Sequence, residues 1–207
     1  MLHQYLLDKF FYKNKSGTIV EVGAAKPDYL SQSKPFKDVG WRVICVEPNP
    51  EFAQMHRDVG NEIYEYAAFS VDDDNIDFHI STNCQAESFS SLGVSTSLCI
   101  GSGYAGVNSI RTSIIKVKVR KLDTILQESK VSQIDCLVID VEGWELDVLK
   151  GFSPEKYKPS IIVLEVVGGK KIEEEYTNYM KSIGYEFDSF DSTTGINIVF
   201  YNKNYSK

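Results

Sequence analysis

The sequence TIVEVGAAKPD, residues Thr18–Asp28, predicts a buried strand that runs into a turn of small residues. Its first five residues are mostly β-branched and apolar, which is typical of a parallel strand covered by helices on both faces. Glu21 interrupts this run, and Gly23, Ala24 and Ala25 follow it. Open α/β sheets bind ligands at the carboxyl ends of their strands, and a glycine lets the backbone approach a ligand closely. We therefore expect a binding site here. The alternative is a purely structural strand-to-helix turn.

Length and composition predict one globular domain, residues 1–207, since the chain is 43% hydrophobic and 25% charged. The net charge of −7 and the pI near 5.0 argue against a broad nucleic-acid surface. No apolar run approaches the roughly 20 residues of a membrane span. Residues 1–17 carry too many charges for a signal peptide and predict an amphipathic helix that caps the domain. A helix lying on a membrane surface is the alternative.

The four cysteines show no spacing typical of a zinc or redox motif. Cys45 and Cys136 lie in apolar runs, where a free thiol acts as a small hydrophobe. Cys84 and Cys99 fall in a predicted loop, and a disulfide bond between them remains an alternative. We expect reduced cysteines and a cytoplasmic protein. The histidines lack paired spacing and are expected at the surface or in packing roles: His3, His56 and His79.

Strand-like and helix-like segments alternate along the chain, which predicts βαβ units and a parallel sheet. Strands are expected at 18–22, 42–47, 62–70, 76–81, 114–122, 135–140 and 160–166. Helices are expected at 27–39, 50–59, 122–128, 144–151 and 171–183. Residues 185–191 and 196–202 predict an antiparallel hairpin. Residues 81–112, rich in Ser, Thr, Gly and Asn, predict a substrate loop or lid, with a disordered insertion as the alternative.

Three acidic residues end predicted strands: Glu47, Asp140 and Glu165. The carboxyl ends of neighbouring parallel strands meet at one edge, so these carboxylates are expected to face one crevice. Glu47 follows Gly23 by about 24 residues, close to the spacing of about 20 at which an acid binds ribose hydroxyls. The alternative is an acid that caps a strand or neutralises a lysine.

The segment IDVEGWE clusters Asp140, Glu142 and Glu145. Asp140 ends a strand and Glu142 begins the next turn, so either could orient a substrate hydroxyl or act as a base. Burial beside a second carboxylate would raise the pKa of one of them and favour that role. Acids favoured by a helix N-terminus are one alternative and a divalent metal site is another. Two ligands are too few for a metal, so none is expected.

Five segments together resemble the FkbM-type family of S-adenosylmethionine-dependent methyltransferases: VEVGAA, CVEPNP, RKLDTIL, VIDVEGWELDVLKG and PSIIVLEV. The likeness runs from Thr18 to Val166. Its most specific part is IDVEGWE, with Leu122 and Asp123 ahead of it. The resemblance implies a three-layer Rossmann-like sandwich with a seven-stranded, mostly parallel sheet and an antiparallel last strand. It also implies methyl transfer from S-adenosylmethionine, usually to an oxygen.

The same resemblance implies roles for individual residues. Asp140 and Glu142 match the acids under the transferred methyl. The cofactor is implied to contact Glu21, Gly23, Ala24 and Ala25 at its amino-acid end, Glu47 at the ribose, Pro48 and Asn49 at the adenosine, Ala67 and Ala68 at the adenine, and also Asp140. The chain departs from the family at Ala25, Lys26, Pro27 and Asp28, where an Asn and a further Gly are usual, so the contact to the methionine carboxylate stays open.

We therefore expect a methyltransferase that acts on a hydroxyl of a small molecule or glycan. An NAD(P)-dependent oxidoreductase is the alternative enzyme, because it also uses a glycine turn and a ribose acid. The missing second and third glycines and the terminal hairpin argue against it. A non-catalytic Rossmann-like binding protein is the third possibility, and Pro27 in the turn is the feature that favours it.

Overall fold

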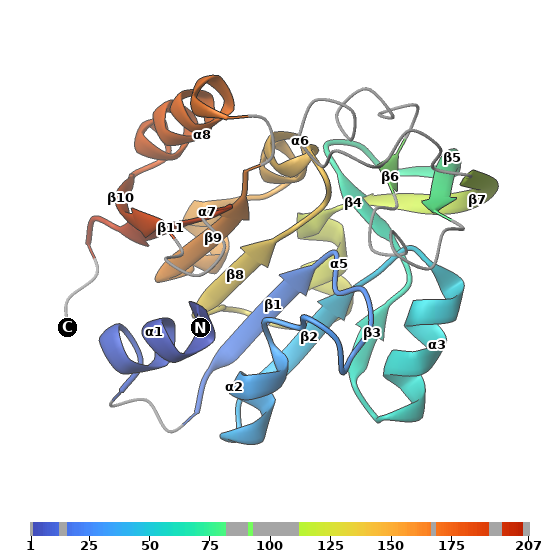
Figure 1. Cartoon of the computed structure of the whole chain (residues 1–207), viewed down its shortest axis with the longest axis horizontal. Helices are drawn as coiled ribbons and strands as arrows, with labels where there is room; N and C mark the ends of the chain where they lie inside the picture. The colour runs from blue at the N-terminus through green and yellow to red at the C-terminus, as the bar shows by residue number, and fades with distance from the viewer. Residues whose placement is uncertain are drawn as a thin grey trace.

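The computed structural model describes residues 2–12, 16–81, 91–92, 112–166, 169–190 and 196–204. Within them, a seven-stranded sheet has the order β10-β11-β9-β8-β1-β2-β3, with β8 at its centre and β1 beside it (Figure 1). β11 runs antiparallel to both of its neighbours, β10 and β9, and the other pairs of neighbouring strands in this sheet are parallel. The predicted Rossmann-like sandwich is confirmed. Its strands are β1 (Thr18–Val22), β2 (Arg42–Val46), β3 (Glu62–Tyr64), β8 (Cys136–Ile139), β9 (Ile161–Glu165), β10 (Tyr185–Phe190) and β11 (Asn197–Asn202).

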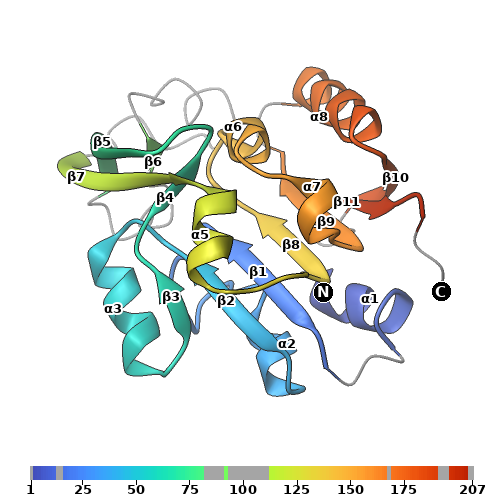
Figure 2. The ribbon, with the colours of Figure 1, turned by 180° about the vertical axis from the view of Figure 1, so that it is seen from behind.

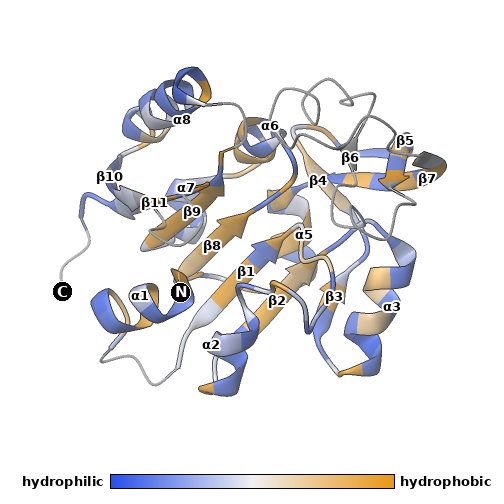
Figure 3. Ribbon diagram, in the orientation of Figure 1, coloured by the Kyte–Doolittle hydropathy of each residue, from blue (hydrophilic) through white to orange (hydrophobic). Residues whose placement is uncertain are grey.

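Helices cover both faces of this sheet, which makes the three layers visible in Figures 1 and 2. Side chains along β1 alternate between the two faces, with Ile19 in one core cluster and Val20 in the other. The strands β8 and β9 are buried over their full length, and Figure 3 shows them as apolar ribbons. One face carries α1 (Leu2–Lys9) and α2 (Lys34–Asp38); the other carries α5 (Leu122–Glu128), α6 (Glu145–Lys150), α7 (Pro154–Tyr157) and α8 (Lys170–Ser182).

A second, four-stranded sheet stands beside the carboxyl ends of β1 and β2 (Figure 1). The expected single strand 62–70 is wrong, because the chain turns at Tyr66, whose N–H donates to the Tyr64 carbonyl at 3.0 Å. β3 pairs with β2, whereas β4 pairs with β7 in the second sheet. The expected lid 81–112 lies mostly outside the described residues. The second sheet has the order β4 (Ala67–Phe69), β7 (Thr112–Lys121), β5 (Asp73–Ser81) and β6 (Ser91–Leu92).

The expected helix 27–39 is wrong over its first half, since α2 begins only at Lys34. The buried carboxylate of Glu21 binds the N–H groups of Gln32 and Ser33, at 2.6 and 3.2 Å, and the hydroxyls of Ser31 and Ser33. A buried carboxylate must find donors, and here it takes them from this loop. The hydrogen bonds to Glu21 therefore keep residues 31–33 out of the helix that the local sequence pattern predicts.

The N-terminal helix α1 packs against the sandwich. Its buried Leu2 and Leu6 join the same cluster as Phe36 and Trp41. Lys9 forms an ion pair with Asp188 of β10, and so ties the beginning of the chain to its last hairpin.

None of the helices in the described residues combines the length and hydrophobicity that crossing a bilayer requires. The cysteine prediction is confirmed for Cys45 and Cys136, which are buried and free. Burial raises the pKa of both thiols, so they stay protonated. Cys84 and Cys99 lie outside the described residues.

Candidate functional site

The turn after β1 is tied to both neighbouring strands, and Gly23 makes this possible. Gly23 has φ +80°, and a Cβ built on it would lie 1.7 Å from the carbonyl oxygen of Asp140. The N–H groups of Gly23 and Ala24 donate to the Val46 carbonyl at 2.9 and 3.2 Å. The ends of β1, β2 and β8 therefore meet at a point where only glycine fits.

Glu47, one residue beyond β2, faces this turn. Its carboxylate accepts the N–H of Ala25 at 2.9 Å and the N–H of Asn49 at 2.8 Å. The pKa of Glu47 is raised to about 7, mainly by burial; the two backbone hydrogen bonds oppose this rise, and the nearby charges of Glu21 and Asp140 contribute to it. A carboxylate offers about four acceptor positions, so Glu47 retains two for a ligand.

His56 supports the same turn from helix α3 (Pro50–Asp58). The Asn61 side-chain amide can only donate to Nδ1, at 2.9 Å, so Nε2 carries the proton and donates to the Ala25 carbonyl at 3.1 Å. Burial lowers the pKa of His56, which keeps the ring neutral. The expected packing role is confirmed, and its link to Ala25, a non-glycine residue at φ +45°, is visible only in the structure.

A small pocket of about 30 Å³ lies between these strand ends and the second sheet. Four residues with an implied cofactor role line it: Gly23, Pro48, Ala67 and Ala68. Tyr66 and Trp144 line it as well, and sequence reasoning did not assign them to a site. Pro48 and Tyr66 also border a larger groove of about 590 Å³, so they form the wall between the two spaces.

Trp144 corrects a prediction, because it is the first residue of the expected helix 144–151. It precedes α6 instead, lines the pocket and packs against Phe69 with ring centroids 5.6 Å apart. Its indole N–H is buried and has no hydrogen-bond partner among the described residues. The preceding Gly143, at φ +98°, is the signal that this tryptophan belongs to a turn.

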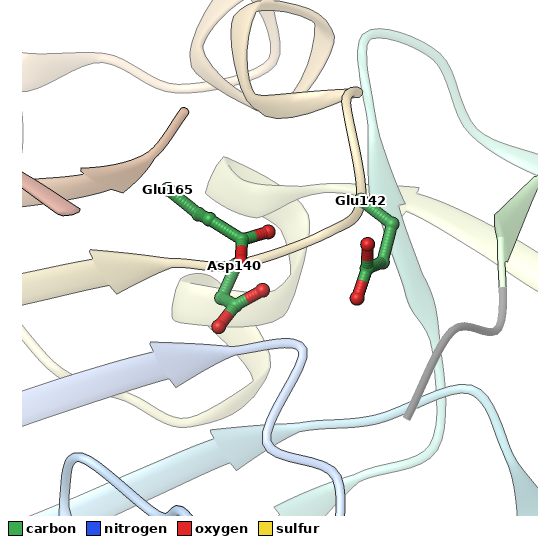
Figure 4. A group of neighbouring side chains, drawn as sticks. All are labelled: Asp140, Glu142 and Glu165. Carbon is green, nitrogen blue, oxygen red and sulfur yellow. The ribbon is translucent and has the colours of Figure 1, made fainter. Parts of the chain in front are cut away.

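Three carboxylates gather beside the pocket, from Asp140 after β8, Glu142 in the following turn and Glu165 at the end of β9 (Figure 4). One oxygen from each lies within 4.8 Å of the others. The pKa of all three groups is raised, mainly by burial; it is about 9 for Glu142 and about 11 for Glu165, where the charge of Asp140 also contributes. The site therefore disfavours three negative charges unless a positive charge is near.

The structure separates Glu145 from this group. Its buried carboxylate accepts the N–H groups of Val141 and Gly143, both at 3.1 Å, and the Tyr176 hydroxyl at 2.5 Å. Glu145 lies in the first turn of α6, as the helix N-terminal alternative predicts. Glu145 therefore stabilises the turn that contains Glu142, whose backbone has φ +57°.

Three residues with implied cofactor contacts have their groups engaged elsewhere. The Glu21 carboxylate binds the 31–33 loop, Ala24 is 2% exposed within the cluster under α1 and α2, and the Asn49 side chain caps α3 by accepting the Glu51 N–H at 3.0 Å. These residues shape the loops around the pocket. Their direct contact with a cofactor stays a prediction.

The LD and LKG segments that helped to define the resemblance have a structural function. Asp123 accepts the N–H and hydroxyl of Ser153, at 2.8 and 2.5 Å, and so joins α5 to the start of α7. Gly151 lies so close to β4 that a Cβ on it would be 2.1 Å from the Phe69 carbonyl oxygen. These residues hold the second sheet against α6.

The family model described as the Methyltransferase FkbM domain matches residues 21–187, which include the second sheet, the strands β2, β3, β8 and β9 of the first sheet, the pocket and all three clustered carboxylates. No curated protein matches the chain significantly.

Proposed function

Since the chain belongs to the FkbM methyltransferase family, we propose that it transfers the methyl group of S-adenosylmethionine to a hydroxyl of a small molecule or sugar. The observation that carries this assignment is the convergence of four residues, far apart in the sequence, on one pocket at the carboxyl ends of the strands: Gly23, Pro48, Ala67 and Ala68. That edge is where open α/β sheets bind ligands.

The chemistry of the residues suits the nucleoside part of the cofactor. Glu47 has two acceptor positions left after binding backbone N–H groups, which match two ribose hydroxyls. The pocket of about 30 Å³ has roughly the volume of one water, so a nucleoside requires its wall to move. Tyr66 forms that wall and is held by Glu128 at 3.1 Å and by the Arg120 guanidinium at 5.3 Å from its ring centre. Both contacts lie near the surface, where they cost little to break.

The acids can then bind and deprotonate the acceptor. Bound S-adenosylmethionine supplies a methyl group on a positively charged sulfur, already activated for in-line displacement. A positive charge beside Asp140 and Glu142 lowers the pKa of both groups. Their ionised carboxylates can orient an acceptor hydroxyl, and a carboxylate oxygen of Glu142 can take its proton. A hydroxyl needs such a base, which favours oxygen as the acceptor atom.

The other predictions follow the same assignment. We propose residues 81–112 as the substrate loop or lid, and the packing of α1 into the sandwich supports a single domain over 1–207. The free, buried thiols of Cys45 and Cys136 support a reducing compartment such as the cytoplasm. Membership of a methyltransferase family leaves the oxidoreductase alternative without support. The methyl-transfer assay described below distinguishes an enzyme from a non-catalytic binding protein.

Calorimetric titration with S-adenosylmethionine, S-adenosylhomocysteine and NADH tests the assignment. We expect one equivalent of each methionine-derived ligand to bind, and no NADH. Glu47→Gln should weaken binding about 10- to 100-fold, because hydrogen bonds to a charged group contribute about 1.5–3 kcal/mol. The matched control is Glu174→Gln, an exposed acid on α8 far from the pocket residues in sequence, which should bind as the parent does.

Thermal unfolding of each variant shows whether it is folded. Failure of the folded parent protein to bind either methionine-derived ligand would overturn the proposed function. Transfer of a radiolabelled methyl group to a panel of sugars and other hydroxyl compounds then separates an enzyme from a non-catalytic binding protein.

A further inference from the structure

We propose that Asp140, Glu142 and Glu165 together bind one divalent cation that prefers oxygen ligands, such as Mg²⁺ or Mn²⁺. Two acids at the end of β8 are too few for such a site. The parallel pairing of β8 with β9 brings in Glu165 as the third ligand (Figure 4). Binding of the cation stands on this geometry alone, whereas its part in catalysis rests on the proposed function.

The spacing of the carboxylates suits a cation. One oxygen from each residue lies within 4.8 Å of the other two. Oxygens on opposite sides of Mg²⁺, at about 2.1 Å, are about 4.2 Å apart, and on opposite sides of Ca²⁺, at about 2.4 Å, they are about 4.8 Å apart. The three oxygens are therefore close enough for one cation to take all of them as ligands after side-chain adjustment.

A separate observation indicates a missing ligand at this point. Glu165 is 7% exposed, and its Oε2 is buried without a hydrogen-bond partner among the described residues. Buried polar oxygens are nearly always paired, so an orphaned carboxylate oxygen needs an explanation. Figure 4 shows that the Glu165 carboxylate points toward Asp140, into the cluster. A bound cation would satisfy this oxygen.

The charge balance also favours a metal ion. None of the ion pairs between described residues includes Asp140, Glu142 or Glu165. Ionisation of all three carboxylates would place a charge of −3 here, and the single charge of a sulfonium would leave most of it unbalanced. A divalent cation neutralises two of these charges and accepts oxygen from all three residues.

The position of the site gives the cation a role in the proposed reaction. Asp140 and Glu142 are only partly buried, so solvent and small molecules can reach the cluster. Mg²⁺ typically keeps several coordination positions for water or substrate. An acceptor hydroxyl in one of these positions would be oriented, and its pKa would be lowered by the cation. We therefore expect acceptors that offer a metal-binding oxygen beside the methylated hydroxyl.

Binding of Mn²⁺ to the full-length protein, after treatment with a chelator and buffer exchange, tests the site. Electron paramagnetic resonance measures free Mn²⁺ directly. We expect one Mn²⁺ per chain, at least tenfold weaker binding by Glu165→Gln, and unchanged binding by the control Glu174→Gln. Absence of stoichiometric binding by the parent protein, or equal binding by a folded Glu165→Gln variant, would overturn the site.

Glu142→Gln keeps the test decisive if Glu165→Gln does not fold, because Glu142 lies in a turn and is only partly buried. It should also weaken Mn²⁺ binding at least tenfold, and unchanged affinity contradicts the site. Titration with S-adenosylhomocysteine on the same preparation separates the two proposals. Cofactor binding without a Mn²⁺ site overturns the metal site alone, and Mn²⁺ binding without cofactor binding overturns the proposed function alone.

Discussion

Glu47 shows how a single carboxylate can serve both the fold and a ligand. It holds the Ala25 and Asn49 N–H groups with one position on each oxygen, and the other positions remain for ribose. Its burial makes ionisation costly before a ligand arrives, which is why its pKa is raised to about 7. Hydroxyl donors stabilise the ionised form and so lower the pKa again.

This gives the affinity for S-adenosylhomocysteine a defined pH dependence. Below pH 7, Glu47 must lose a proton on binding, and above it the carboxylate is already ionised. We therefore expect affinity to rise by up to tenfold per pH unit from pH 5.5 to about 7 and to level off above. Calorimetry in buffers of different ionisation enthalpy counts the released proton. Glu47→Gln should flatten the profile, which separates Glu47 from His56; a rise that persists in this variant contradicts the assignment.

At the scale of elements, the turn between β8 and α6 depends on a side chain from α8. Tyr176 donates to Glu145, which in turn holds the Val141 and Gly143 N–H groups. Tyr176→Phe removes the hydroxyl and leaves a buried carboxylate oxygen without its donor. We expect a loss of about 1.5–3 kcal/mol in the free energy of unfolding, measured by urea denaturation. A loss below about 0.5 kcal/mol would show that Glu145 does not need this hydroxyl.

The junction of α6 with the second sheet provides a steric prediction. Gly151 has φ −91°, which alanine adopts freely, yet a Cβ would lie 2.1 Å from the Phe69 carbonyl oxygen. Gly151→Ala must therefore move backbone, and we expect a loss of about 3 kcal/mol or more. Gly60→Ala is the control, since a Cβ on Gly60 would meet open space. Its only expected cost is the backbone strain of an alanine at φ +69°, about 1–2 kcal/mol. Equal losses in urea denaturation would contradict the close contact.

At the scale of the whole molecule, α1 joins the beginning of the chain to the centre and to the far edge of the sheet. Leu6 is 1% exposed and belongs to the cluster with Phe36 and Trp41, whereas Lys9, whose side chain is 35% exposed, reaches Asp188 in β10. The helix is therefore one part of the core, and its apolar face contributes more to stability than its ion pair.

Two substitutions on α1 separate these contributions. Leu6→Ala should lower the free energy of unfolding by about 2–5 kcal/mol, because it opens a cavity in the core. Lys9→Ala, on the same helix, should cost about 1 kcal/mol or less, since the Lys9 side chain is 35% exposed. Urea denaturation of both variants measures the difference. A small effect of Leu6→Ala would mean that α1 is loosely attached.

The sequence by itself determined the sheet and the edge that carries the site. Buried strands are recognisable as short apolar runs, and the acids and glycines that follow them are recognisable as strand ends. Gly23, Glu47 and Asp140 could be placed at one edge for that reason. These features depend on residues close together in the chain, so the linear pattern contains them.

Only the tertiary structure decided how distant groups meet. Glu21 takes its donors from the 31–33 loop and so removes the expected helix there, and the chain beyond Tyr64 leaves one sheet for another. Glu165 reaches Asp140 and Glu142 only because β9 lies beside β8. A buried polar group takes whichever partner the folded chain brings within reach, and that choice depends on long-range packing which no local pattern records.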